Sequence, residues 1–220
     1  MIALEELAQK IEPVYTYPNY PRRIRHQQRT MLISEMLARS LNLPDEEIEE
    51  IMLAARFCNN CERFWPEYMI DKVHTDFTID DVKRIKTHPF ESARFLENDL
   101  SVASNSYPKG ALEIIRYHHE TYTPSAYGYP GKKFGEDIPI GSRIILVAES
   151  YAAMRSSREH RSLWARTWPH SYAIDELIEK TFESKDEMRV RKDAEYCPTV
   201  VSALMQISKE ELDKLFVNVS

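Results

Sequence analysis

The chain has 220 residues, a formal net charge of −6, and a composition that is 43% hydrophobic and 29% charged. This composition is typical of a globular protein, and the length allows one sizeable core with short extensions. The net charge argues against a general basic surface for DNA, although a few local cations could hold a small anion. No apolar run is long enough to span a membrane, no signal-peptide pattern is present, and three cysteines fit poorly with a secreted disulfide framework. We therefore expect a cytoplasmic protein.

The first predicted helix spans residues 27–42, where apolar residues recur at roughly helical spacing. Pro44 and Asp45 then open a second helix with apolar residues at i, i+3, i+4 and i+7. Thr78 and Asp81 form a Thr-x-x-Asp pattern, which caps the start of a helix. Each of these patterns has the helical period, and none alternates with the period of a strand.

Pro89 suits the first turn of a further helix, which predicts His88 as the N-cap of that helix. The stretch 122–140 holds three of the five glycines and three prolines, so we expect a loop there. Helical periodicity resumes in three segments, followed by a short tail helix opened by Ser208 and Glu211; these segments are 141–155, 171–183 and 198–206. The sequence therefore predicts an all-α protein with seven or more helices in one domain.

Several histidines lie near the predicted helix ends and close to acidic residues. His26 begins a helix, His88 precedes a proline, and His118 and His119 are adjacent near the end of a helix. Glu149 lies on the helix that follows the loop. Imidazoles and carboxylates from separate helices are how helical bundles assemble transition-metal sites. The spacing alone also allows histidines that merely pack in the core or lie on the surface.

The order of motifs along the chain is more specific. The motifs are His118-His119-Glu120, Gly128-Tyr129-Pro130, the segments 138–144, 147–151 and 157–161, with His88-Pro89 upstream and 195–201 at the end. In order and spacing they resemble the signature of the HD-GYP family. The resemblance implies a single compact helical HD-domain-like bundle at residues 20–207, between an N-terminal extension at 1–19 and a C-terminal tail helix at 208–220.

The resemblance also implies a function. HD-GYP domains are metallo-phosphodiesterases that hydrolyse cyclic di-GMP with two or three metal ions, often iron. Five positions match metal ligands of the family, with Glu149 standing where the family has Asp: His26, His88, His118, His119 and Glu149. Arg158 and Arg161 match positions that contact ligand phosphates. Family members contact GGDEF-type signalling proteins through the loop that contains Gly128, Tyr129 and Pro130.

The sequence departs from the family at the residues that name it. Cys58 replaces the His and Asn59 replaces the Asp, while Glu62 stands where the family has Lys and Arg22 where many members have Glu. Each lost charge pair about 4 Å apart is worth roughly 4 kcal/mol at an effective dielectric near 20. We therefore expect at least one metal position to be lost. Two outcomes stay open: one Fe, Mn or Zn ion on the remaining histidines, or no metal.

Other residues have a structural interpretation beside the functional one. Cys58 and Cys61 form a Cys-x-x-Cys spacing without a second cysteine pair, which favours small buried thiols over a zinc site. Lys132 and Lys133 are expected in solvent, although they could steer a phosphate.

Three functions are compatible with these observations. The first is a degenerate domain in bacterial cyclic di-GMP signalling that binds cyclic di-GMP or a protein and has impaired catalysis. The second is a phosphodiesterase with an altered mono-metal site, and the third is a metal-free interaction scaffold.

Overall fold

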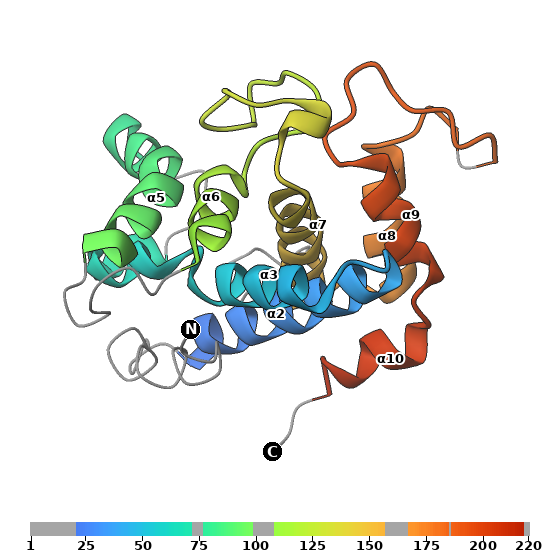
Figure 1. Ribbon diagram of the computed structural model, residues 1–220, viewed down its shortest axis with the longest axis horizontal. Helices are drawn as coiled ribbons and strands as arrows, with labels where there is room; N and C mark the ends of the chain where they lie inside the picture. Colours follow the sequence, from blue (N-terminus) through green and yellow to red (C-terminus); the bar gives the residue numbers. More distant parts are fainter. Residues whose placement is uncertain (1–20, 72–76, 99–107, 157–166, 185, 218–220) are drawn as a thin grey trace.

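The computed structural model describes residues 21–71, 77–98, 108–156, 167–184 and 186–217. Figure 1 shows these residues as a bundle of helices. The helices are α2 (Pro21–Ser40), α3 (Asp45–Phe57), α4 (Glu67–Asp71), α5 (Ile79–Asn98), α6 (Lys109–Tyr117), α7 (Ile140–Arg155), α8 (His170–Glu179), α9 (Pro198–Gln206) and α10 (Lys209–Lys214). Short 3-10 helices span Asn60–Phe64 and Gly135–Asp137. Within these ranges the only β-structure is an isolated bridge between Phe182 and Val190, which confirms the all-α class.

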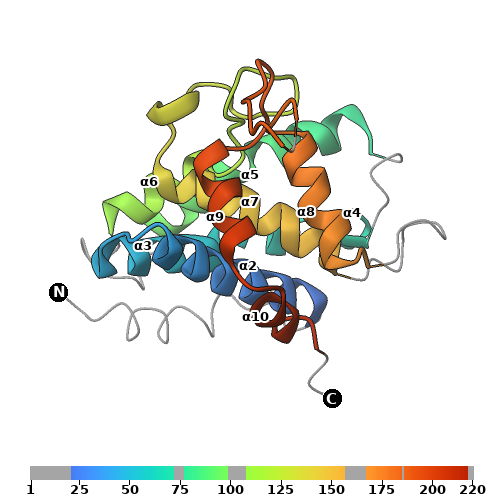
Figure 2. The ribbon, with the colours of Figure 1, turned by 90° about the vertical axis from the view of Figure 1, so that its right-hand side faces the viewer.

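Helix α7 is the centre of the bundle because apolar residues surround it on most sides. It packs against α2, α3, α6, α8 and α9, and most of its first thirteen residues are buried. Gly141 lets the start of α7 approach its neighbours, since a Cβ there would lie 2.6 Å from Ile114 and 2.8 Å from Ile51. Figures 1 and 2 show α2 and α3 as a layer along one side of this central helix.

Two predicted helix starts are confirmed by their hydrogen bonds. The backbone N–H of Thr78 donates to Asp81 Oδ2 at 2.9 Å, and that of Asp81 donates to Thr78 Oγ1 at 3.2 Å. Ser208 caps α10 by accepting from the backbone N–H of Glu211. These bonds satisfy donors that the first turn of a helix leaves without a partner.

Two expectations about helix starts are wrong. Pro89 does not open a helix, because α5 runs continuously through it from Ile79 to Asn98; His88 is therefore inside a helix and is not an N-cap. His26 does not begin α2, which starts at Pro21. Helix α2 extends further towards the N-terminus than the apolar pattern indicated, because polar residues form its first turns. The helix that begins after Thr78 continues through Pro89 instead of ending before it.

The segment 122–139, which we call the Gly-Tyr-Pro loop, is irregular as predicted, apart from the 3-10 turn within it. It lies over the ends of α6 and α7 (Figure 1). Gly128 is required by close packing, since a Cβ there would lie 2.3 Å from Thr121 Oγ1. The backbone N–H of Tyr129 donates to the carbonyl of His119 at 3.0 Å, which places the loop beside the adjacent histidines.

The tail helix α10 packs against α2 and α7 rather than standing apart. Leu212 is fully buried. Arg155 of α7 donates to Asp213 at 2.7 Å and to the hydroxyl of Tyr151 at 2.7 Å. The guanidinium groups of Arg29 and Arg155 each lie 4.8 Å from the centroid of the Phe216 ring. The end of the described chain is therefore fixed by contacts with both α2 and α7.

Across the part of the chain that the structure describes, every helix is too short or too polar to cross a membrane.

Candidate metal-binding site

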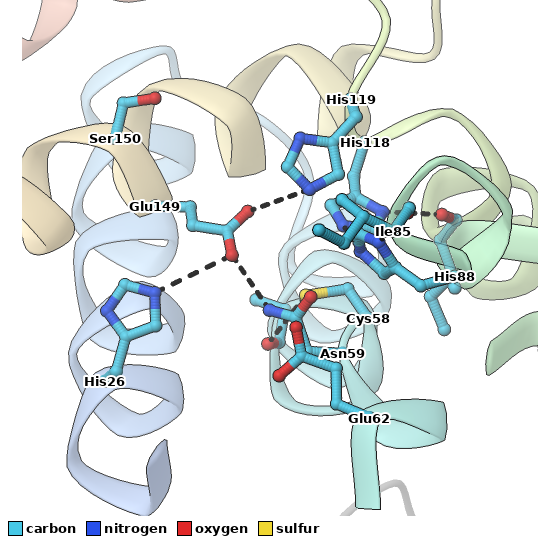
Figure 3. A network of polar contacts seen from close by, with 12 residues as sticks. His26, Cys58, Asn59, Glu62, Ile85, His88, His118, His119, Glu149 and Ser150 are labelled. Atoms are coloured by element: carbon cyan, nitrogen blue, oxygen red, sulfur yellow. Dashed lines mark hydrogen bonds and ion pairs between the residues drawn. The ribbon is translucent and has the colours of Figure 1, made fainter. Parts of the chain in front are cut away.

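Three histidines, one within α5 and two that directly follow α6, converge at one buried place. His88 lies in the middle of α5, and His118 and His119 follow the last turn of α6. One ligand atom from each ring lies within 4.8 Å of the others. His88 and His118 are buried, and the His119 side chain is 20% exposed. Figure 3 shows the three rings facing the same small region.

Pro89 fixes the orientation of the His88 ring. Within a helix the N–H of residue 89 would donate to the carbonyl of Ile85, but proline has no N–H. The Nδ1 atom of His88 lies 2.7 Å from this carbonyl oxygen instead. Because a carbonyl can only accept, Nδ1 of His88 carries the proton, and its Nε2 lone pair is free to bind an ion.

The end of α6 fixes His118 in the same way. The helix ends at Tyr117, so its last carbonyls lack helical donors. Nδ1 of His118 lies 2.7 Å from the carbonyl oxygen of Ile115, three residues earlier. Its Nε2 therefore also presents a lone pair, and it lies 3.2 Å from Nε2 of His88. Two facing lone pairs repel unless a proton or a cation lies between them.

The carboxylate of Glu149 lies between the histidine cluster and α2. Its Oε2 is 3.7 Å from His119 Nε2, and its Oε1 is 3.6 Å from His26 Nε2. The amide Nδ2 of Asn59 donates to Oε1 at 2.8 Å. Figure 3 shows Glu149 among these three side chains. His26 is thus on the far side of Glu149 from the other histidines.

The electrostatics of the site favour neutral imidazoles beside an ionised carboxylate. Burial lowers the pKa of His119 to about 3, and it also lowers the pKa of His88 and of His118. Burial alone would raise the pKa of Glu149, but the contact with His26 holds it well below its usual value. A neutral imidazole is the form that binds a metal ion.

Cys58, Asn59 and Glu62 are also buried, beside the histidines. The thiol of Cys58 donates to the carbonyl of Ala55 at 3.5 Å, and burial raises its pKa well above the usual value. Glu62 binds Arg23 in an ion pair of 2.8 Å, with 8% of the Glu62 side chain exposed. The end of α3 and the turn after it therefore present a neutral thiol and an amide, with a paired carboxylate nearby.

Aromatic rings border the cluster on two sides. The Tyr129 ring stacks on that of His119, with centroids 4.5 Å apart and an angle of 25°. The indole of Trp65 meets His88 edge to face at 6.1 Å. Burial raises the pKa of Tyr129 well above its usual value, so its hydroxyl is neutral. These rings shield the histidines from water.

The structure brings most of the predicted site residues together. The five candidate ligands surround one region, with His26 at its edge, and Tyr129 covers it. Lys132 and Lys133 lie outside, where Lys133 pairs with Glu113. Arg158, Arg161 and the side chain of Arg22 lie outside the described residues.

Sequence reasoning missed one residue of the site, Trp65, and left open whether Arg23 belongs to a solvated basic turn with Arg22 and Arg25 or to the site. The structure pairs Arg23 with Glu62. No motif in the sequence pointed to Trp65 as part of the site, and only the nearby aromatic residues Phe64 and Tyr68 indicated an apolar segment.

A sequence profile described as an HD domain matches residues 18–183. The chain is 32% identical to the cyclic di-GMP phosphodiesterase response regulator RpfG of Xanthomonas campestris over 133 residues, which are 60% of this chain and 33% of that protein. It is 24% identical to the 3'3'-cGAMP-specific phosphodiesterase 2 of Vibrio cholerae, covering 82% of this chain and 30% of the relative. It is 25% identical to a cyclic di-GMP phosphodiesterase of Thermotoga maritima, covering 86% and 45%.

The fold is similar to that of a solved structure, Bd1817, a HDG"Y"P protein from Bdellovibrio bacteriovorus, with a TM-score of 0.58. The match has 16% sequence identity and covers 81% of this chain and 50% of the other. The chain thus spans between 30% and 50% of the length of the proteins it matches.

Proposed function

This chain belongs to the HD domain family, and we propose that it is a degenerate HD-GYP-type domain that acts in cyclic di-GMP signalling by binding, with impaired catalysis. Two of its relatives are named as cyclic di-GMP phosphodiesterases, and a third is named for 3'3'-cGAMP. These names support a cyclic dinucleotide as the class of ligand.

The hydrogen bond from Asn59 to Glu149 is the observation that carries this proposal. The amide donates to Oε1 of the carboxylate at 2.8 Å, so a neutral donor and not a second carboxylate lies beside Glu149. An amide supplies no negative charge, and Cys58 is held by a backbone carbonyl. A cluster of two or three cations would lack compensating charge here, and catalysis that depends on such a cluster would be impaired.

The remaining donor set fits one ion. Metal–nitrogen bonds of about 2.05 Å in a tetrahedral site place neighbouring nitrogens about 3.3 Å apart, and Nε2 of His88 and Nε2 of His118 are 3.2 Å apart. His119 and Glu149 are the further donors, with Oε2 of Glu149 on the side of His119. Three imidazoles suit Zn or Fe. A bound ion would lower the pKa of a coordinated water and neutralise charge on a phosphate.

Binding and turnover of cyclic di-GMP test the proposal together. Calorimetry under anaerobic conditions, with Mn²⁺ present, measures binding, and chromatography of the same samples measures release of linear pGpG or GMP. We expect micromolar binding with no turnover. Turnover that is abolished by His118→Ala with His119→Ala would contradict impaired catalysis. Absence of binding would leave a metal-free scaffold as the better description.

A protein ligand is the second form of the same proposal. The Gly-Tyr-Pro loop presents Tyr127, which is 79% exposed, so a GGDEF-type signalling protein could dock there. Biolayer interferometry against such a protein should show binding that Tyr127→Ala weakens at least tenfold. Equal weakening by Tyr172→Ala, an exposed tyrosine on α8, would argue against the loop as the contact.

An active phosphodiesterase with an altered mono-metal site is the alternative function. The convergence of the three histidines favours it, because the free Nε2 atoms of His88 and His118 face one region beside His119. Hydrolysis of cyclic di-GMP that depends on one equivalent of Fe or Mn would support this alternative over the binding role.

A further inference from the structure

Glu120 is a buried carboxylate that the proposed metal site does not use. It directly follows His119, and it is 1% exposed. Its Oε2 accepts the backbone N–H of Gly131 at 2.8 Å. Its Oε1 accepts the backbone N–H of Lys132 at 2.7 Å and that of Lys133 at 3.1 Å. Both oxygens are thus satisfied by three successive amides of the Gly-Tyr-Pro loop.

The three hydrogen bonds to Glu120 favour one conformation of the loop at residues 131–133. A hydrogen bond from a backbone N–H to an ionised acceptor is stronger than a neutral one, and three such bonds converge here. The amides can reach one carboxylate only if residues 131–133 curve around it, and Gly131 allows this with a φ of 73°. The lysine side chains contribute by packing outside, where Lys132 lies over the Phe90 ring and Lys133 over the Tyr117 ring.

The same anchor fixes the ring that covers the histidines. Tyr129 is two residues before the first anchored amide, and its N–H donates to the carbonyl of His119 at 3.0 Å. Its ring stacks on His119 and meets His88 edge to face at 5.9 Å. His119, Glu120 and Tyr129 therefore form one unit, in which the residue beside the metal ligand holds the loop that covers it.

We infer that Glu120 is a positioning residue: it seats the Gly-Tyr-Pro loop on His119 and couples the order of this loop to metal binding at the histidine cluster. This inference rests on the proposed metal site. Coupling is reciprocal, so an ion bound by His119 stabilises the seated loop by the same factor by which the seated loop raises metal affinity. A protein that docks on the seated loop would then bind more tightly when the histidine cluster holds a metal ion.

The test compares Glu120→Gln with Glu136→Gln in the full chain. The first substitution keeps the size of the side chain but turns an NH₂ group towards amide donors. Glu136 is the matched control, because it lies in the same loop, accepts from Tyr122 and Arg143, and has 69% of its side chain exposed. Hydrogen exchange at residues 131–133 is measured with and without Zn²⁺, and Zn²⁺ affinity is measured by competition with a chelator.

We expect Zn²⁺ to slow amide exchange at residues 131–133 in the wild-type protein. In Glu120→Gln this protection is lost, and Zn²⁺ affinity falls about 5- to 150-fold, the usual range of coupling between sites. Glu136→Gln changes neither quantity. Lost protection with unchanged Zn²⁺ affinity would reduce Glu120 to an anchor of the loop and would overturn the coupling, as would unchanged exchange in Glu120→Gln.

A second measurement separates this inference from the proposed metal site. The Tyr129 ring, stacked 4.5 Å from that of His119, shifts the imidazole proton resonances of His119 upfield. In metal-free Glu120→Gln these resonances should move downfield, and in Glu136→Gln they should stay. If the wild-type protein binds no Zn²⁺, the proposed metal site fails and so does the coupling to it, whereas the resonance shift alone decides whether Glu120 seats the loop. Unmoved His119 resonances would overturn that role.

Discussion

The side-chain amide of Asn59 and the carboxylate of Glu149 are joined by a hydrogen bond of 2.8 Å, from Nδ2 to Oε1. Asn59 comes from the turn after α3 and Glu149 from α7, 90 residues later. Asn59 is 5% exposed and the Glu149 side chain is 15% exposed. This bond stabilises one buried negative charge at a place where a second carboxylate would need a cation between the two.

Asn59→Asp should make the protein depend on metal for stability. Without an ion, two buried carboxylates would meet at about hydrogen-bonding distance, and unfolding by urea should show a loss of about 2 to 3 kcal/mol. Mn²⁺ should restore most of this loss and raise the bound metal measured by elemental analysis. Asn60→Asp is the control, because Asn60 is buried next to it but is not bonded to Glu149. An equal response of both variants to Mn²⁺ would contradict the prediction.

Removal of His118 and His119 together should abolish metal binding. Elemental analysis for Fe, Mn and Zn on anaerobically purified protein should give about one ion in the wild-type protein and none in the double alanine variant. The loss of affinity should exceed the roughly 10- to 100-fold effect of removing an outer partner of a ligand. His170→Ala is the matched control, since His170 lies at the start of α8 and binds the Tyr151 hydroxyl. If the double variant retained its metal, the histidine cluster could not be the metal-binding site.

The metal-free protein should lose stability as the pH falls below about 6.5. Burial lowers the pKa of His119 to about 3 and also lowers those of His88 and His118. Below the unfolded pKa of about 6.5, the unfolded chain binds protons that the folded chain does not, so stability is complete above this pH. The lowered pKa of Glu149 acts in the same direction below about 4.5.

The free energy of unfolding should fall by up to about 1.4 kcal/mol per pH unit for each of the three histidines. Urea unfolding between pH 7 and 5 measures it. His119→Asn should reduce the slope by the share of one histidine, because asparagine does not titrate. A slope that is the same in both proteins would show that His119 is protonated equally in the folded and unfolded chains.

Arg155→Ala should destabilise the protein through the C-terminal helix. The change removes hydrogen bonds to Tyr151 and Asp213 and the contact with the Phe216 ring. We expect a loss of about 1 to 3 kcal/mol in the free energy of unfolding. Arg189→Ala is the control, because the Arg189 side chain is 68% exposed and pairs with exposed glutamates, so its effect should stay within about 0.5 kcal/mol. Similar losses in both variants would mean that α10 contributes little.

Helix positions were predictable where one apolar stripe faces the core, as in α3 and α9, because burial and helical period then coincide. The start of α2 at Pro21 was not predictable, because polar residues form its first turns, and neither was the continuation of α5 through Pro89. Of the site, the motif order predicted that His88, His118 and His119 would meet. The pairing of Arg23 with Glu62 could not be predicted, because it depends on the angle at which α2 passes the turn after α3.

Pro89 is a helix-disrupting residue within α5, and its missing N–H leaves the carbonyl of Ile85 to the His88 ring. The ring therefore has its orientation and its tautomer before any ion arrives. Fixing the orientation and tautomer of the ring lowers its entropy, and this cost arises when the protein folds and not when the metal binds. A proline that costs the helix one hydrogen bond thus makes His88 a preorganised ligand, so an ion should bind without a slow ring flip.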